Sequence, residues 1–160
     1  MGHPVLFLDI DGVLNTDRFL DSLPKTKLLH MADVHTLPEN IDRVHVPRLN
    51  TITRSVDAHI VVSSTWRMGM TVTDLQTALR RVGVEARVIG STPFLAYKPR
   101  GEEIHAWLRD NGRSIDPFVI LDDTDEMGDL RPWLVKTHMT TGLTDGHVPM
   151  AIKILRDGPP

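Results

Sequence analysis

Residues 4–15, Pro-Val-Leu-Phe-Leu-Asp-Ile-Asp-Gly-Val-Leu-Asn, decide how the rest of this chain is interpreted. The apolar run 5–8 is followed by two carboxylates one residue apart, Asp9 and Asp11, and then by Gly12. A short apolar run that ends at a turn residue is typical of a strand buried on both faces of a parallel sheet. Carboxylates at the end of such a strand are costly to desolvate, and bound Mg²⁺ would offset that cost. The alternative is an acidic turn in which Asp-Gly only supplies the bend.

Composition predicts an ordinary globular protein with one domain, residues 1–160. The hydrophobic fraction is 41%, the charged fraction is 24%, and the formal net charge of −3 provides no overall basic field for nucleic acid. The absence of cysteine excludes disulfides, thiolate metal sites and cysteine nucleophiles. No signal peptide or long apolar span is visible, so we expect a cytoplasmic protein without a membrane partner. The sequence does not indicate the oligomeric state.

The alternation of apolar runs and amphipathic segments predicts a three-layer, Rossmann-like α/β fold. It has a central, mainly parallel sheet of about five strands, with helices on both faces. The expected strands are residues 5–8, 59–63, 84–89, 118–121 and 134–137. The expected helices begin at Pro47, at a cap formed by Thr71 or Thr73, near Glu102, and at a cap formed by Thr144.

Residues 16–46 form a polar stretch with little periodicity, which we interpret as a small insertion or flap beside the active site. It contains His30, His35 and His45, which raise the hypothesis of a zinc site. Their spacings match no familiar ligand pattern, so loop histidines are the better interpretation.

Polar residues follow three of the predicted strands: Asp9 and Asp11, then Ser63, then the pair Asp122–Asp123. Ligands of parallel sheets bind beyond the carboxyl ends of the strands, so these groups should meet at one edge. Converging acids repel unless a divalent cation lies between them, and oxygen ligands favour Mg²⁺ over zinc.

Such a site suits phosphoryl transfer. Asp9 would be the nucleophile, and Asp11 would protonate the leaving oxygen and later activate water. Ser63 and a cation from Lys98 or Arg100 would bind the phosphate oxygens. Trp66 is expected to pack in the interior, and Arg67 to be a surface or substrate-side cation.

This ordered set of motifs resembles the haloacid dehalogenase (HAD) superfamily. Within it, Val62-Ser63-Ser64-Thr65-Trp66-Arg67, Arg100-Gly101-Glu102-Glu103-Ile104, Val119-Ile120-Leu121-Asp122-Asp123 and Thr141-Gly142-Leu143-Thr144 are similar to the HAD domain of Swiss Army Knife RNA-repair proteins. The resemblance implies a fold without a large cap domain. It also implies an open site of a kind often found in enzymes acting on nucleic-acid ends or other bulky phosphoesters.

The resemblance also implies roles for individual residues. Mg²⁺ would be held by Asp9, the carbonyl of Asp11, and the pair Asp122–Asp123, with Asp123 as the direct ligand. The phosphate-binding cation would be Lys98, with Arg100 as its rival. We expect substrate contacts from Gly12, Ser64, Arg67 and Arg100.

The function that follows is a Mg²⁺-dependent phosphomonoester phosphatase acting through an aspartyl-phosphate. Its substrate would be a phosphorylated small molecule, such as a nucleotide, or a nucleic-acid end. The alternatives are a non-catalytic phosphate- or nucleotide-binding module and a phosphotransferase on the same fold.

Overall fold

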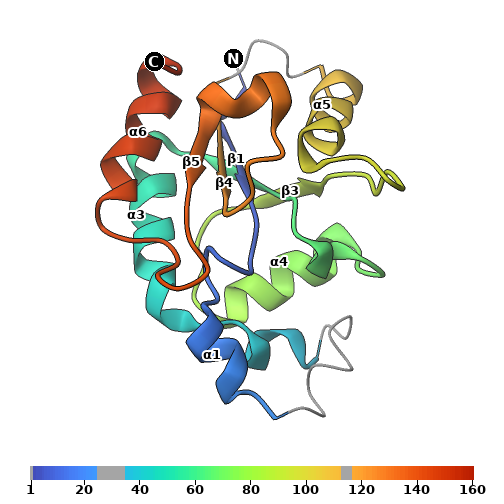
Figure 1. The fold of residues 1–160 in the computed structure, drawn as a ribbon, viewed down its shortest axis with the longest axis vertical. Coiled ribbons are helices and arrows are strands. Elements are labelled where there is room, and N and C mark those ends of the chain that lie inside the picture. The colour runs from blue at the N-terminus through green and yellow to red at the C-terminus, as the bar shows by residue number, and fades with distance from the viewer. Residues whose placement is uncertain (1, 25–34, 113–116) are drawn as a thin grey trace.

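The computed structural model describes residues 2–24, 35–112 and 117–160. Five parallel strands form one sheet in the order β3-β2-β1-β4-β5 (Figure 1). The strands are β1 (Val5–Leu8), β2 (His59–Val62), β3 (Val88–Ser91), β4 (Phe118–Asp122) and β5 (Leu134–Lys136). The predicted parallel α/β fold is confirmed.

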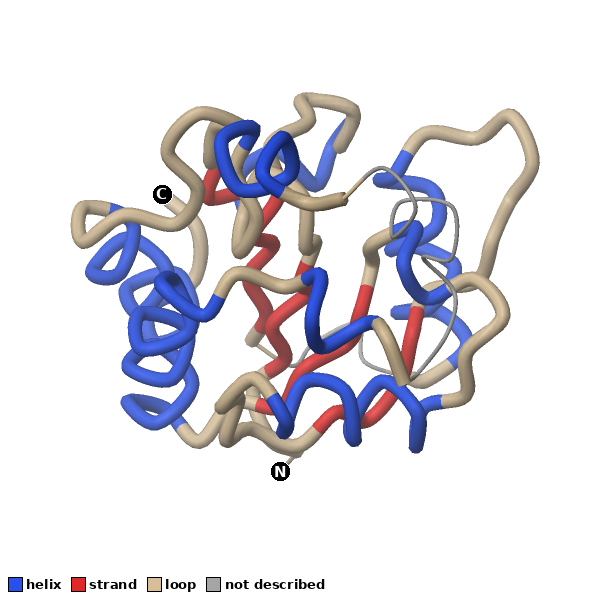
Figure 2. Tube along the Cα trace, turned by 90° about the horizontal axis from the view of Figure 1, so that it is seen from below, coloured by secondary structure: helices blue, strands red, loops and turns tan. Residues whose placement is uncertain are grey.

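Helices cover both faces of this sheet (Figure 2). The α-helices are α1 (Asp17–Ser22), α3 (Val46–Val56), α4 (Val72–Arg81), α5 (Arg100–Asp110) and α6 (His147–Asp157). Short 3-10 helices are η1 (Leu37–Asn40), η2 (Arg43–His45), η3 (Thr65–Arg67) and η4 (Gly128–Trp133). Apolar side chains of α3, α4 and α6 share one core with the sheet, and those of α5 and η4 share the other.

Strand β1 explains why its sequence is a continuous apolar run. Successive side chains point to opposite faces of a sheet. Leu6 and Leu8 therefore enter the core beneath α3, α4 and α6, while Val5 and Phe7 enter the core beneath α5. All four side chains are fully buried. On the α5 side, the rings of Phe7 and Trp107 meet edge to face with centroids 5.5 Å apart.

The order of the strands places the carboxyl ends of β1 and β4 at the topological switch point. The chain builds β1, β2 and β3 outward in one direction and then returns to add β4 on the other side of β1. Leu8 pairs with Leu121, and the N–H of Asp9 donates to the carbonyl of Leu121 at 3.1 Å. Asp9 and Asp122 therefore leave adjacent strands side by side, where parallel sheets bind ligands.

Most strands end one residue away from the predicted position, and two boundaries differ by more. The third strand is residues 88–91 rather than 84–89, because the N–H of Val84 still donates to the carbonyl of Leu79 at the end of α4, and Gly90 lies inside the strand, against α5. A Cβ at Gly90 would be 2.8 Å from Nε1 of Trp107, so glycine permits this close helix–sheet packing. The last helix is capped at Gly146, and the N–H of Thr144 instead donates to Nδ1 of His147 at 3.0 Å.

The other helix starts are close to the predictions. Helix α3 begins at Val46, one residue before Pro47. Helix α5 begins at Arg100, two residues before the expected start. Of the two threonines proposed to cap α4, Thr71 does so, in a reciprocal capping box with Asp74.

The segment 16–46 is described on both sides of residues 25–34, so His30 lies outside the described residues. Asn15, at the end of the first motif, holds the part of this segment that follows residue 34. Its side chain donates to the carbonyl of Asn40 at 2.9 Å and accepts from the N–H of Asp42 at 2.8 Å. His45 is buried with Nδ1 2.9 Å from the carbonyl oxygen of Leu143, which indicates a structural role. Within the described ranges, no helix is both long and apolar enough to cross a membrane.

Candidate active site

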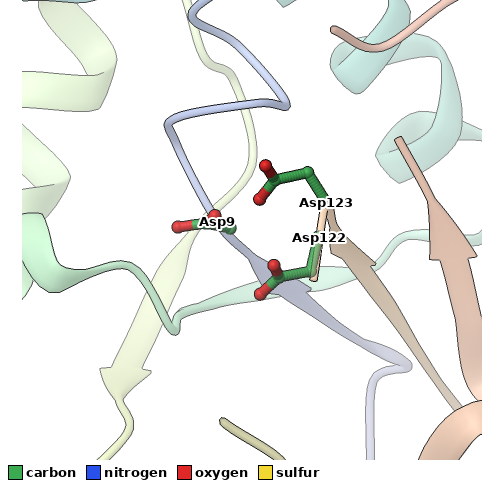
Figure 3. Close-up of side chains that lie close together, drawn as sticks. All are labelled: Asp9, Asp122 and Asp123. Carbon is green, nitrogen blue, oxygen red and sulfur yellow. The ribbon is translucent and has the colours of Figure 1, made fainter. Parts of the chain in front are cut away.

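Three carboxylates meet at the carboxyl ends of β1 and β4. Asp9 follows β1, Asp122 is the last residue of β4, and Asp123 comes next in the chain. Each offers an oxygen within 4.8 Å of the other two (Figure 3). Asp122 is fully buried and Asp9 is only 5% exposed. Oxygen-rich clusters of this size suit a hard divalent cation.

Burial makes negative charge unfavourable at two of these positions. Desolvation, followed by repulsion from Asp122, raises the pKa of Asp9 from 3.8 to about 7. Desolvation likewise raises the pKa of Asp122 to about 6, although the positive charge of Arg100 acts against it. Since a bound cation favours the ionised form, the cluster has the electrostatic character expected of a metal site.

Gly12 gives Asp123 its place in the cluster. Its φ is +83°, and a Cβ on this residue would be 2.5 Å from Cγ of Asp123. A side chain at position 12 would therefore collide with a carboxylate of the cluster, in a backbone conformation that already disfavours side chains. Gly12 was expected to contact substrate. That role stays a prediction, and the close approach to Asp123 supplies a separate reason for glycine.

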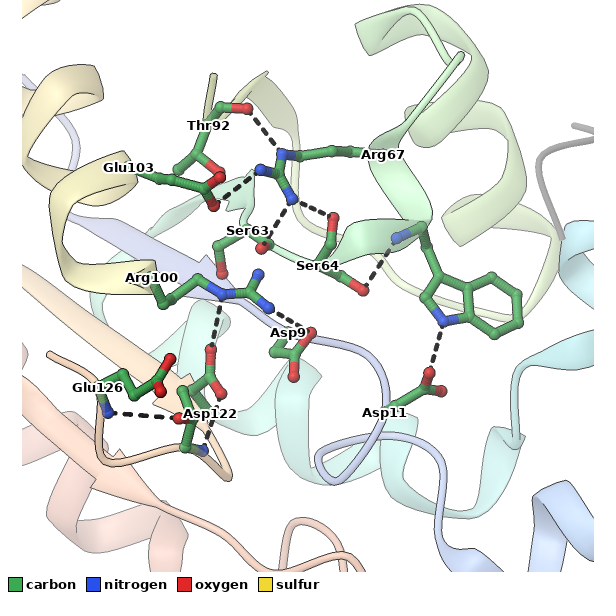
Figure 4. Close-up of polar contacts among 12 residues, drawn as sticks. Asp9, Asp11, Ser63, Ser64, Arg67, Thr92, Arg100, Glu103, Asp122 and Glu126 are labelled. Atoms are coloured by element: carbon green, nitrogen blue, oxygen red, sulfur yellow. Dashed lines mark hydrogen bonds and ion pairs between the residues drawn. The ribbon is translucent and has the colours of Figure 1, made fainter. Parts of the chain in front are cut away.

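Arg100, the first residue of α5, reaches into the carboxylate cluster (Figure 4). Its Nη2 lies 4.0 Å from Oδ1 of Asp9, and its Nε lies 3.7 Å from Oδ2 of Asp122. Lys98 is exposed and lines the same pocket. The sequence favoured Lys98 as the phosphate-binding cation. Arg100 is the one that contacts the carboxylates, and the choice between them stays a prediction.

Several buried polar atoms here lack a hydrogen-bond partner among the described residues. They are Oγ of Ser63, Oδ2 of Asp122 and Nη1 of Arg100. Buried groups of this kind are costly unless a ligand satisfies them. The carboxylate oxygen, which has Arg100 nearby but accepts no hydrogen bond, suits a cation, while the hydroxyl and the guanidinium nitrogen suit phosphate oxygens. This donor and acceptor set therefore fits Mg²⁺ together with a phosphate group.

The side chain of Asp11 is not part of the carboxylate cluster and is held by two hydrogen bonds. Its Oδ2 accepts from the indole Nε1 of Trp66 at 2.8 Å, and its Oδ1 accepts from Nδ2 of Asn15 at 3.0 Å (Figure 4). Trp66 is buried as expected, but its contact with Asp11 was missed. Trp66 is 55 residues away along the chain, and no spacing pattern indicates such a pair.

Arg67 corrects an expectation. It was assigned to the surface or to substrate binding, yet it is only 5% exposed. Its guanidinium makes five hydrogen bonds inside the protein, as many as the group has N–H donors. The acceptors are the carbonyls of Ser63, Ser64, Thr92 and Pro93 and Oε2 of Glu103. With every N–H donor already in use, Arg67 joins the loops around the site to α5. Its burial contradicts a surface position, and its assignment to substrate binding stays a prediction.

Ser64 lies beside the nucleophile candidate. Its Oγ caps η3 by accepting from the N–H of Trp66 at 3.3 Å, and a hydrogen bond with Asp9 lowers the pKa of that carboxyl. The cluster opens into a pocket of about 260 Å³. The pocket is lined by Asp9, Thr65, Arg67, Phe94, Lys98, Arg100, Glu103, Asp122, Asp123, Thr124 and Glu126.

The profile of one protein family, the HAD domain in Swiss Army Knife RNA repair proteins, matches residues 5–148. This range contains every residue assigned to the site above. The chain belongs to this family of HAD domains. The predicted membership of the HAD superfamily is therefore confirmed. No curated protein and no solved structure gives a significant match.

Membership indicates that this HAD domain is a hydrolase of the HAD type. HAD domains generally use Mg²⁺, and the buried cluster of Asp9, Asp122 and Asp123 could bind such an ion.

Proposed function

We propose that this HAD domain is a Mg²⁺-dependent phosphomonoesterase that acts through an aspartyl-phosphate. The observation that carries the proposal is the trio of buried Asp9 and Asp122 with half-buried Asp123, beside two unsatisfied donors on Ser63 and Arg100. The three acids and the guanidinium line one pocket, and together with the buried hydroxyl of Ser63 they supply ligands for a cation and for a phosphate group.

The carboxylates of Asp9, Asp122 and Asp123, with the carbonyl of Asp11, would hold the ion. When bound, Mg²⁺ neutralises the acids and draws charge from the phosphate oxygens.

The chain's own residues account for two chemical steps. A carboxylate oxygen of Asp9 attacks phosphorus, the ester P–O bond breaks, and Asp11 gives its proton to the leaving oxygen. Water then attacks the phosphorus of the aspartyl-phosphate and passes a proton to Asp11, the P–O bond to Asp9 breaks, and inorganic phosphate leaves with the Asp9 carboxylate restored. Trp66 and Asn15 hold Asp11 in place while each of its oxygens keeps a further lone pair for the proton.

The transition state spreads charge over three equatorial oxygens, so donors aimed at them lower the barrier. The free hydroxyl of Ser63 and Nη1 of Arg100 are available for this task, with Lys98 as a further cation at the pocket. Phosphate monoesters hydrolyse extremely slowly in water, and catalysis must remove on the order of 20 kcal/mol from the barrier. Preorganised buried hydrogen-bond donors are the main means of lowering this barrier.

For the substrate we propose a nucleotide or a phosphorylated nucleic-acid end. The family description, which names RNA repair proteins, supports this class. In the described part of 16–46, only α1 and two 3-10 helices are present, which suits an open site.

The test is release of inorganic phosphate from an aryl phosphate and from nucleotides, with and without Mg²⁺. We expect activity that needs the ion and that falls by about three orders of magnitude or more in Asp9→Asn. The control is Asp157→Asn, at the exposed end of α6. Binding of phosphate without turnover would instead indicate a binding module, and release only when an acceptor other than water is present would indicate a phosphotransferase.

A further inference from the structure

The chain's exposed aromatic side chains are concentrated in one loop. The sequence has four Phe, three Trp and one Tyr residues, all within the described ranges. Only Phe94 and Tyr97 among them are exposed, Phe94 by 61% and Tyr97 completely. Leaving a large apolar ring in water forgoes much of the free energy that its burial would contribute. Two such rings in one short loop indicate a binding surface.

These rings belong to the connection between β3 and α5, which projects from the body of the molecule (Figure 1). Phe94 lines the same pocket as Asp9 and Arg100, and so does Lys98, the residue after Tyr97. The loop therefore forms one wall of the candidate active site and continues outward from it. A molecule whose phosphate enters the pocket would extend its remaining atoms along this wall.

The backbone of the loop is firmly held although its rings are exposed. Arg67 donates to the carbonyls of Thr92 at 2.7 Å and Pro93 at 3.2 Å. Glu103 accepts from the N–H of Leu95 at 3.1 Å. These bonds lie on both sides of Phe94, so its ring is presented from an ordered support.

Tyr97 has an unusual backbone conformation. Its φ is +61°, in the left-handed region that bulky side chains rarely adopt. Lys98 closes the turn by donating its N–H to the carbonyl of Leu95 at 3.0 Å. Strain of this kind persists where surrounding structure maintains it, and it is concentrated at sites of function. Here it accompanies a ring fully exposed to solvent.

We propose that Phe94 and Tyr97 form a stacking subsite for the nucleobase of a phosphorylated nucleotide. This inference rests on the proposed function and adds that the active site prefers substrates that carry a nucleobase. Bases stack on aromatic rings with little regard to sequence, since every base presents a π-face, and cations beside such rings attract the adjoining backbone phosphates. The exposed Lys98 provides that charge. A free nucleotide and the end of a strand carry the same recognition elements.

The experiment compares two ligands that share a ribose phosphate and differ in the base. Calorimetry with Mg²⁺ and the Asp9→Asn protein, which prevents turnover, measures the Kd of adenosine 5′-monophosphate and of ribose 5-phosphate. We expect the base to tighten binding about tenfold. Phe94→Leu and Tyr97→Leu, which keep apolar volume but remove the ring, should each move the ratio of the two Kd values toward one.

Two matched variants separate stacking from general effects. Tyr97→Phe keeps the ring and should preserve the ratio. Met150→Ala removes an exposed apolar side chain on α6 and should also leave the ratio unchanged. Equal affinity for the two ligands, no binding of either, or a ratio insensitive to both leucine variants would overturn the inference.

The experiment distinguishes failure of the stacking subsite from failure of the proposed phosphatase activity. A base preference that depends on the rings, in a wild-type protein without turnover, would sustain the subsite and refute the phosphatase. Phosphorylated oligonucleotides with an intact or an abasic terminal nucleotide distinguish the two sources of the base. A larger effect of the base on the strand than on the free nucleotide identifies a strand end as the ligand.

Discussion

Asp122 illustrates how a single buried side chain can be retained for a purpose other than stability. It is fully buried, faces Asp9, and has Arg100 as a cation at 3.7 Å. Its pKa is nevertheless raised to about 6, because desolvation outweighs the attraction of the arginine. At neutral pH the ionised carboxylate therefore lowers the stability of the metal-free protein.

Replacing Asp122 by Asn should consequently raise the metal-free Tm at pH 7.5, by a few degrees, and abolish the stabilisation that Mg²⁺ provides. Thermal unfolding with EDTA and with Mg²⁺ measures both effects. Asp129→Asn is the contrast, because a hydrogen bond from His105 lowers the pKa of this exposed acid. The Tm of the Asp129→Asn protein should therefore not rise. A lower metal-free Tm in Asp122→Asn would contradict this account of the charge.

Gly12→Ala tests the contact between the first motif and Asp123. Its Cβ would lie 2.5 Å from Cγ of Asp123, so the carboxylate must move and Mg²⁺ affinity should fall by about tenfold or more. Gly158 has nearly the same φ, +84°, but a Cβ there would have no neighbouring atom within 4 Å. Gly158→Ala therefore carries only the backbone penalty, about 1–3 kcal/mol. Calorimetric titration with Mg²⁺ should separate the two variants.

At the scale of elements, one buried ion pair connects three parts of the site. Nη2 of Arg67, in η3, lies 2.8 Å from Oε2 of Glu103 in α5, and Arg67 also holds the start of the connection between β3 and α5. The side chains are 4% and 8% exposed. Truncating one partner would leave the other charge buried and unpaired, which is far more costly than losing a surface pair.

Glu103→Ala should therefore destabilise the protein by about 3 kcal/mol and lower Tm by roughly 10 °C. The matched control is Glu85→Ala, which removes a pair with Arg54 of similar length, 3.0 Å, but with side chains 55% and 65% exposed. We expect less than about 1 kcal/mol from the control. Urea unfolding of the two variants provides the comparison, and equal losses would argue against a supporting role for the buried pair.

At the scale of the whole molecule, the acid cluster should make stability depend on pH and on Mg²⁺ together. The folded-state pKa values of Asp9 and Asp122, about 7 and about 6, lie above the ordinary value of 3.8. The folded state then binds more protons than the unfolded state between these limits. The contribution of these groups is fully present below about pH 4 and is lost as the pH rises to about 7.

Between about pH 4 and about pH 7, the cluster alone should lower the metal-free Tm as the pH increases. Mg²⁺ should restore stability mainly above pH 7, where the acids are ionised. At an ion concentration about 100 times Kd, the expected gain is about 2.7 kcal/mol. Scanning calorimetry at pH 5 and pH 8, with and without the ion, is the measurement. An equal shift at both pH values would exclude the cluster as the binding site.

Much of this molecule is determined by its sequence. Runs such as residues 5–8 and 118–121 contain enough consecutive apolar residues to require burial on both faces, and the parallel sheet follows from their alternation with helices. The acids Asp9, Asp122 and Asp123 could be assigned to one edge, because strands that run parallel end at the same edge. Family membership was also recognisable, since it depends on the order of these motifs.

The tertiary structure alone decided contacts that have no periodic signature. Trp66 contacts Asp11, Arg67 points inward to Glu103, and Gly90 leaves room for Trp107. The distance along the sequence between the two partners is different in each of these pairs. Local propensity and hydrophobic pattern act over a few residues, whereas the direction of a long polar side chain depends on which buried partner the completed fold offers. For the same reason, the packing of α5, more than its sequence, determined that Arg100 contacts the carboxylates.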